Sequence, residues 1–200
     1  MRHTMIRTWW LLALCGILEA VYSALNLFMM NPDGTLEMRT FAVRVTVVFL
    51  GRFALAAGIC AVAAGLWSLG RNGSWLLVLN GLALSAYGLI SVFWRHGRLQ
   101  FLPIALLFVV MAASIAALMW GSMPRLRRHA VDKWFVALAG AVAVCFAVGF
   151  IVSGFGWVRF DQPGSYFLWM SLYFGFSAIC MLALGLRLNS IRAAGHRMAH

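Results

Sequence analysis

Charged side chains are scarce in this 200-residue chain, and acidic ones are nearly absent. It has 16 Lys and Arg residues but only 5 Asp and Glu residues, while 64% of its residues are hydrophobic. Soluble domains carry about a quarter charged residues, so this composition excludes a water-soluble globule and indicates a protein that lies in hydrocarbon. The net charge of +11 does not indicate a nucleic-acid partner, because the basic residues lie mostly between apolar blocks.

The residue patterns of enzymes and metal sites are also missing. The four cysteines form no Cys-x-x-Cys pair, the histidines lie outside the apolar runs, and there is no His-Glu-x-x-His or Gly-x-Ser-x-Gly motif. No two acidic residues lie close together within an apolar run. We therefore predict no enzymatic activity, no catalytic residue, no metal and no cofactor.

Long apolar runs are what the sequence does contain. Each run is long enough to cross about 30 Å of hydrocarbon as a helix, and all nine Trp residues lie at or near run ends, where membrane interfaces favour them. The chain is therefore predicted to be all-α, a single membrane domain over residues 1–200 with six transmembrane helices. The runs are 9–30, 44–68, 75–94, 101–120, 134–157 and 166–186.

The basic residues predict which way the helices cross the membrane. Ten Lys and Arg residues lie in the N-terminal tail, the second and fourth connections and the C-terminal tail, against four in the other connections. The positive-inside rule then places both termini in the cytoplasm, including the tail at 188–200.

An internal repeat is the most specific pattern in the chain. Trp10, Gly16 and Tyr22 recur as Trp75, Gly81 and Tyr87, and again as Trp134, Gly140 and Phe146. The even-numbered runs repeat as well, with Ala57, Ala61 and Gly65 aligned to Ala113, Ala117 and Gly121, and Gly65 also aligned to Gly185. This predicts three tandem helix hairpins, over residues 9–69, 74–121 and 133–187.

These small residues are predicted to be helix-packing positions. Residues four apart share a helix face, and small side chains there let membrane helices approach closely. Two interpretations stay open, namely packing within one six-helix bundle and a face that forms a homo-oligomer.

Two ionisable residues, Glu19 and Arg52, lie deep in the apolar runs. Counted from the apex of the first hairpin their depths match, so we predict an intramembrane ion pair between them. Three interpretations compete: a lock on the register of the first two helices, a proton or substrate site, or an Arg52 side chain that snorkels outward and never meets Glu19. Tyr22, Asn26, Asn80 and Tyr87 are expected to hydrogen-bond across helices near this pair.

The repeat resembles the short membrane repeat of the HdeD-like acid-resistance family. The resemblance runs from about Trp9 to Arg192 and rests on the Trp-led helix with its glycine, a turn containing proline, and a small-residue helix ending in Gly-Leu. The closest match is in the third copy, over residues 161–164, 173–179 and 183–187. The resemblance implies six transmembrane helices in the bacterial inner membrane and a part in surviving acid or envelope stress, but no active-site residue.

Two functions are therefore expected to compete. The favoured one is a non-enzymatic inner-membrane protein of the stress response, acting through membrane integrity or contact with an unidentified membrane partner. The alternative is a small transporter or channel in which Glu19 and Arg52 line a proton or ion path. The lipid bilayer is a predicted partner in both.

Overall fold

The computed structural model describes the chain as six helices. They are α1 (Trp9–Met29), α2 (Leu36–Trp67), α3 (Ser74–Phe93), α4 (Phe101–Ser122), α5 (Ala130–Gly154) and α6 (Pro163–Arg197). Side chains are described for residues 9–27, 49–67, 75–93, 103–120, 134–152 and 168–186. The predicted all-α class is confirmed for the described part of the chain. The charge bias that predicted orientation falls mostly on connections and tails outside these residues.

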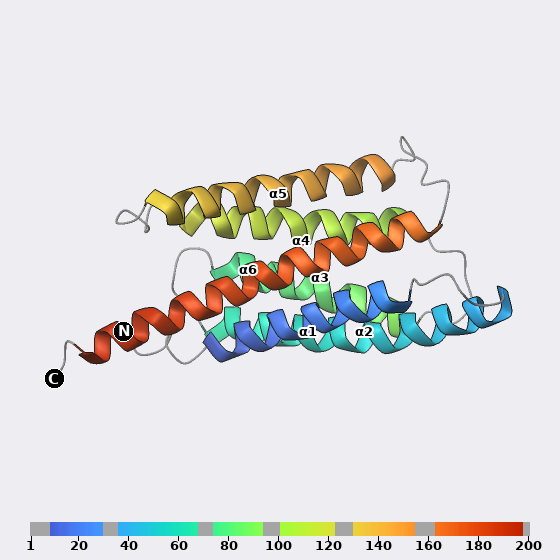
Figure 1. Cartoon of the computed structure of the whole chain (residues 1–200), viewed down its shortest axis with the longest axis horizontal. Helices are drawn as coiled ribbons and strands as arrows, with labels where there is room; N and C mark the ends of the chain where they lie inside the picture. Colours follow the sequence, from blue (N-terminus) through green and yellow to red (C-terminus); the bar gives the residue numbers. More distant parts are fainter. Residues whose placement is uncertain are drawn as a thin grey trace.

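All six helices are long and apolar enough to cross a membrane. They lie side by side along the long axis of the molecule, and α1 begins at the end of the bundle where α6 ends (Figure 1). The helices extend beyond some predicted runs: α2 begins at Leu36 and α6 continues to Arg197, into the segment predicted as a tail. Hydropathy marks the part of a helix that lies in hydrocarbon, whereas backbone hydrogen bonding continues into the interface.

The most extensive helix contacts join α2 to α3, α4 to α5 and α6 to α1. The α2·α3 contact is made through backbones: a Cβ atom added at Gly81 would lie 2.6 Å from Val62 N and 2.7 Å from Gly58 O. The α1·α6 contact is also a close backbone approach at a glycine, because a Cβ atom added at Gly16 would lie 3.0 Å from Ala178 O. Small residues thus let these helices approach where lipid offers no hydrophobic incentive to associate.

Gly140 and Gly185 also lie at helix contacts. A side chain at Gly140 would collide with the ring of Trp120 on α4, and a Cβ at Gly185 would lie 3.1 Å from Trp9 O on α1. These glycines, like Gly16 and Gly81, face neighbouring helices of the same bundle. The packing interpretation of these residues therefore fits the structure without an oligomer.

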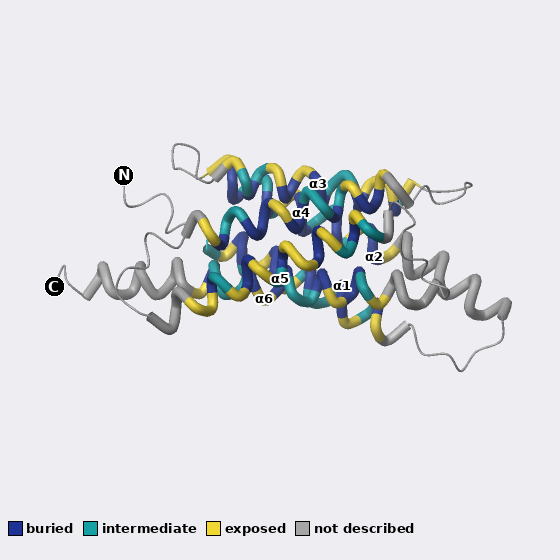
Figure 2. Tube along the Cα trace, turned by 90° about the horizontal axis from the view of Figure 1, so that it is seen from above, coloured by how far each residue is buried: buried dark blue, intermediate teal, exposed yellow. Residues whose placement is uncertain are grey.

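Burial follows the repeat closely in the odd-numbered helices. One stripe of each helix faces the interior, and the opposite stripe is exposed (Figure 2). The aligned positions Glu19, Leu84 and Ala143 are all buried, as are Tyr22, Tyr87 and Phe146. The three odd helices therefore present equivalent faces to the core.

In the even-numbered helices the burial pattern corrects the predicted register of α4. Ala57, Ala61 and Gly65 of α2 are buried, and so is Gly185 of α6. Their predicted counterpart Ala113 is exposed and Ala117 only half-buried, while the surroundings of Gly121 lie outside the described side chains. The α4 residues whose burial matches α2 come two positions earlier, at Met111, Ile115 and Met119, and Ala112 beside them is buried too. Aligning small residues placed the helix about half a turn away from its true packing face.

This register makes a testable prediction at two neighbouring alanines. Ala112→Leu should destabilise the protein by about 1 to 3 kcal/mol, because Ala112 is fully buried and the added atoms overfill the core. Ala113→Leu should change stability by less than about 0.5 kcal/mol, because the new side chain points outward. Thermal unfolding of both variants in detergent, followed by size exclusion, measures the difference. The opposite ranking would restore the predicted register.

Candidate functional site

Glu19 lies in the middle of α1 and faces the interior of the bundle. Only 2% of the residue is exposed. The Cys15 thiol, one helical turn away, donates a hydrogen bond to Glu19 Oε1 across 3.5 Å, and Oε2 has no hydrogen-bond partner among the described residues. A carboxyl group is therefore held inside the bundle with one oxygen unsatisfied.

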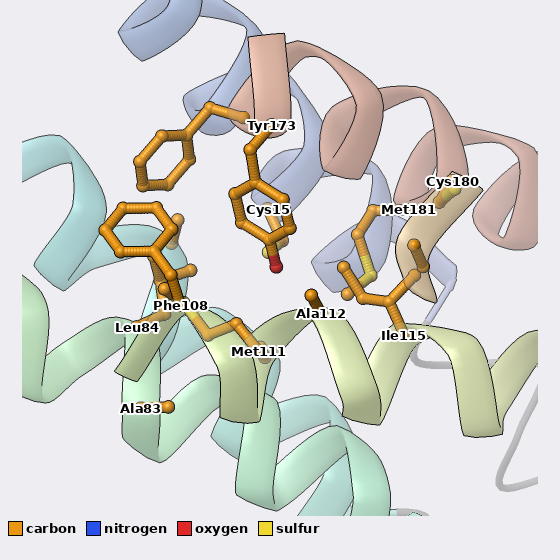
Figure 3. Close-up of a cluster of buried hydrophobic side chains, with 14 of the residues drawn as sticks. Cys15, Ala83, Leu84, Phe108, Met111, Ala112, Ile115, Tyr173, Cys180 and Met181 are labelled. Atoms are coloured by element: carbon orange, nitrogen blue, oxygen red, sulfur yellow. The ribbon is translucent and has the colours of Figure 1, made fainter. Parts of the chain in front are cut away.

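The α6 helix supplies the other wall of this site. Tyr173, Ser177 and Cys180 share one face of α6, since they are four and three residues apart. The Ser177 hydroxyl lies near both the Glu19 carboxyl and the Tyr173 hydroxyl, close enough to act as a hydrogen-bonding neighbour of each. Tyr173 is 1% exposed, and its hydroxyl, which also lacks a hydrogen-bond partner, points into the interior toward α4, beside Cys15 (Figure 3). We call Cys15, Glu19, Tyr173, Ser177 and Cys180 the carboxyl cluster.

Arg52 is not part of this cluster. It is exposed on α2, in line with Ile59 and Leu66, which are also exposed. Within the described residues no ion pair joins Arg52 to Glu19, so the predicted pair is not formed. The placement agrees with the third interpretation, in which the Arg52 side chain is directed outward and its long stem lets the guanidinium reach toward the interface.

A second group of polar side chains lies between Glu19 and the C-terminal end of α1. The Tyr22 and Tyr87 hydroxyls are hydrogen-bonded across 2.6 Å. Ser171 of α6 takes part in two more bonds: Ser23 Oγ donates to its carbonyl oxygen across 2.8 Å, and Asn26 Nδ2 donates to its hydroxyl across 2.6 Å. We call Tyr22, Ser23, Asn26, Tyr87 and Ser171 the polar column.

Sequence reasoning found part of this arrangement. Tyr22, Tyr87 and Asn26 do hydrogen-bond across helices, and Asn80 does so with Ser114 of α4, across 3.2 Å. Every α6 residue of the cluster and the column was missed. A signal was present, because Cys15, Glu19, Tyr22 and Asn26 recur at heptad spacing on one face of α1, and that polar face needs a polar partner.

The cluster does not look like a metal centre. Among the described residues, no three His, Cys, Asp or Glu side chains converge as metal ligands would. What the cluster offers is one carboxyl, two hydroxyls and two thiols, all on a pair of adjacent helices. These are groups that exchange protons and hydrogen bonds.

With six helices of this length and composition around a largely apolar core that holds a few polar side chains, the fold is that of a multi-pass membrane protein. The chain matches no family model, and no curated protein or solved structure is similar to it.

Proposed function

We propose that this protein handles protons, as a small transporter or channel in which Glu19 is the group that binds and releases the proton. The observation that supports the proposal is the buried Glu19 carboxyl, which has neither a cation beside it nor a hydrogen-bond partner for Oε2 among the described side chains. An ionisable group inside a membrane bundle is expensive to bury and usually marks a proton or substrate path.

The internal repeat acts as a control for the alternative that Glu19 only fills space. Its equivalents are Leu84 in the second copy, 1% exposed, and Ala143 in the third, 0% exposed. Packing at this position is therefore satisfied by apolar side chains, and the carboxyl is an exception that packing does not require. Nor does it form the register lock predicted with Arg52, because Arg52 is exposed on the outside of α2.

The surrounding groups suit a carboxyl that gains and loses a proton. The Cys15 thiol donates to Oε1, so it can stabilise charge on the carboxylate. The Tyr173 and Ser177 hydroxyls can each donate or accept, so they can serve either form of the acid. Changes in protonation at Glu19 can thus be accommodated by rotation of neighbouring hydroxyls.

Proton flux into proteoliposomes tests this function. Glu19→Gln keeps the shape of the side chain but removes its titratable proton, and we expect it to reduce flux by at least about a hundredfold, the scale of a lost acid–base group. Arg52→Gln is the matched control, since it also removes one charge from a membrane helix but at an exposed position. Equal flux in wild type and Glu19→Gln would contradict the role of Glu19 in transport. A membrane that stays tight with both proteins would contradict transport itself.

A second candidate function is a non-enzymatic part in acid or envelope stress, in the bacterial inner membrane with both termini in the cytoplasm. It is supported by the resemblance of the repeat to the HdeD-like family and by the charge bias of the connections. The closely packed, glycine-lined helix contacts suit a protein that acts through membrane integrity or a membrane partner. Acid survival of a deletion strain separates the candidates: rescue by Glu19→Gln favours this second function, and rescue by wild type alone favours the first.

A further inference from the structure

The polar groups of the interior are distributed unevenly about Glu19. The polar column continues from Glu19 toward the end of α1 at Met29, and Ser91 extends it by donating to the Tyr87 carbonyl across 2.9 Å. All five residues of the column are buried, so their hydroxyl and amide groups lie inside the bundle and not against lipid. Hydrogen-bonding groups from three helices, α1, α3 and α6, thus line this half of the interior.

Beyond the Cys15 and Cys180 thiols, the half of the interior toward the start of α1 is packed mainly with apolar side chains. Leu182 and Ala178 of α6 press against Gly16, and Gly185 lies against the backbone of Trp9 and Ala13. Figure 3 shows Met181 and Ile115 facing one another next to Cys15 in this region. The polar pair formed by Asn80 and Ser114 also lies in this half, but its described hydrogen bonds run from Ser114 to Asn80 of α3 and to the Met111 carbonyl within α4, and none reaches α1.

We infer, building on the proposed function, that protons reach Glu19 from one side only, through the polar column and from the end of the bundle at which α1 terminates. Tyr22 follows Glu19 by three residues on α1 and therefore lies on the same face, one turn along. A hydroxyl can accept a proton on its oxygen while releasing its own to the next acceptor, so a proton handed between the Tyr22 and Tyr87 hydroxyls leaves both neutral. With the charge bias of the connections, this end is the non-cytoplasmic one.

Hydrogen–deuterium exchange of the Glu19 carboxyl measures this access directly. The full chain in lipid vesicles would be exposed to D₂O, and the carboxyl C=O band followed by infrared spectroscopy, with the Glu19→Gln variant identifying the band. We expect the Tyr22→Phe, Tyr87→Phe double variant to slow exchange by about fivefold or more, the effect of losing one hydrogen bond from the path. Phenylalanine is expected to fit because the third copy has Phe146 at the equivalent position.

Ser114→Ala is the matched control, since it removes a hydroxyl from the other half of the interior. Its exchange rate should equal that of the wild type. Exchange that is unaffected by the tyrosine substitutions, or slowed equally by Ser114→Ala, would overturn the inferred route. If the double variant lost its helical circular dichroism, Tyr22→Phe alone would be measured against the same criteria.

These measurements also separate this inference from the transport proposal. Slower exchange in the tyrosine variant together with a proton-tight membrane would support the column and reject transport. Absence of any carboxyl band that disappears in Glu19→Gln would reject both, because Glu19 would then bind no proton.

Discussion

Glu19→Leu should give a protein that is more stable than the wild type by about 2 to 3 kcal/mol and that carries no protons. The gain is expected because Oε2 has no hydrogen-bond partner of good geometry in the part of the chain that the structure describes, so the wild-type chain buries a poorly compensated polar atom. Leucine is the side chain that the second copy of the repeat has at this position, in Leu84. The substitution gives up the long hydrogen bond from Cys15 and the nearby Ser177 hydroxyl.

Unfolding in mixed micelles with increasing SDS measures this change in stability. Arg52→Leu serves as the control, and its effect should be smaller because the Arg52 side chain is exposed and does not depend on buried partners. A Glu19→Leu protein less stable than the wild type would show that the carboxyl holds the helices together. That result would revive a structural role for Glu19.

Gly88→Ala should cause one of the largest losses of stability of any single-methyl change in the chain, about 3 kcal/mol. A Cβ atom at Gly88 would lie 2.5 Å from Leu55 N and 2.8 Å from Gly51 O. Both atoms belong to the backbone of α2, so the clash is relieved only if α2 and α3 separate. Side-chain rotation offers no relief.

Gly175→Ala is the matched control for this prediction. Its added Cβ would meet only the side chain of Ser23, at 3.1 Å from Oγ, a contact that a shift of a few tenths of an ångström relieves. Both substitutions raise helix propensity equally, so the difference between them isolates the α2·α3 contact. The yield and thermal stability of the monodisperse protein in detergent give the comparison. Equal stability of the two variants would mean that α2 and α3 do not pack backbone to backbone at Gly88.

The number and order of the helices were predictable because hydropathy reports directly on what a segment can bury in hydrocarbon. The rotation of each helix about its own axis was harder to predict from the sequence. Depth counting placed Glu19 and Arg52 at the same height but carried no information on which way each side chain points. The small residues did indicate the direction of the Arg52 side chain. Arg52 is nine positions from Ala61, which places it half a helical turn away from the packing stripe of α2 and therefore on its outer face.

The partners of Glu19 were not predictable for a related reason. Which helix faces α1 depends on how the three hairpins close on each other, and the pattern within a single hairpin does not encode this. Nothing in the local sequence marks Tyr173 and Ser177 as site residues either. They are a single tyrosine and a single serine within a segment in which most other positions are apolar or aromatic. Gly88 was missed because the aligned residues of the other copies are Ser23 and Ala147, so the repeat hides the close contact at α3.

The pairing of α2 with α3, α4 with α5 and α6 with α1 means that each of the most extensive contacts joins helices from two different hairpins. Each of these contacts joins the second helix of one hairpin to the first helix of another. A single hairpin therefore carries both kinds of contact surface, but its own two helices do not form this contact with each other. Separate hairpins of this kind would satisfy it head to tail, and the ring closes at three, as a heterologous trimer with cyclic symmetry would. In the present chain the three hairpins are covalently linked, so the aligned positions Glu19, Leu84 and Ala143 can differ and only one of them carries a carboxyl.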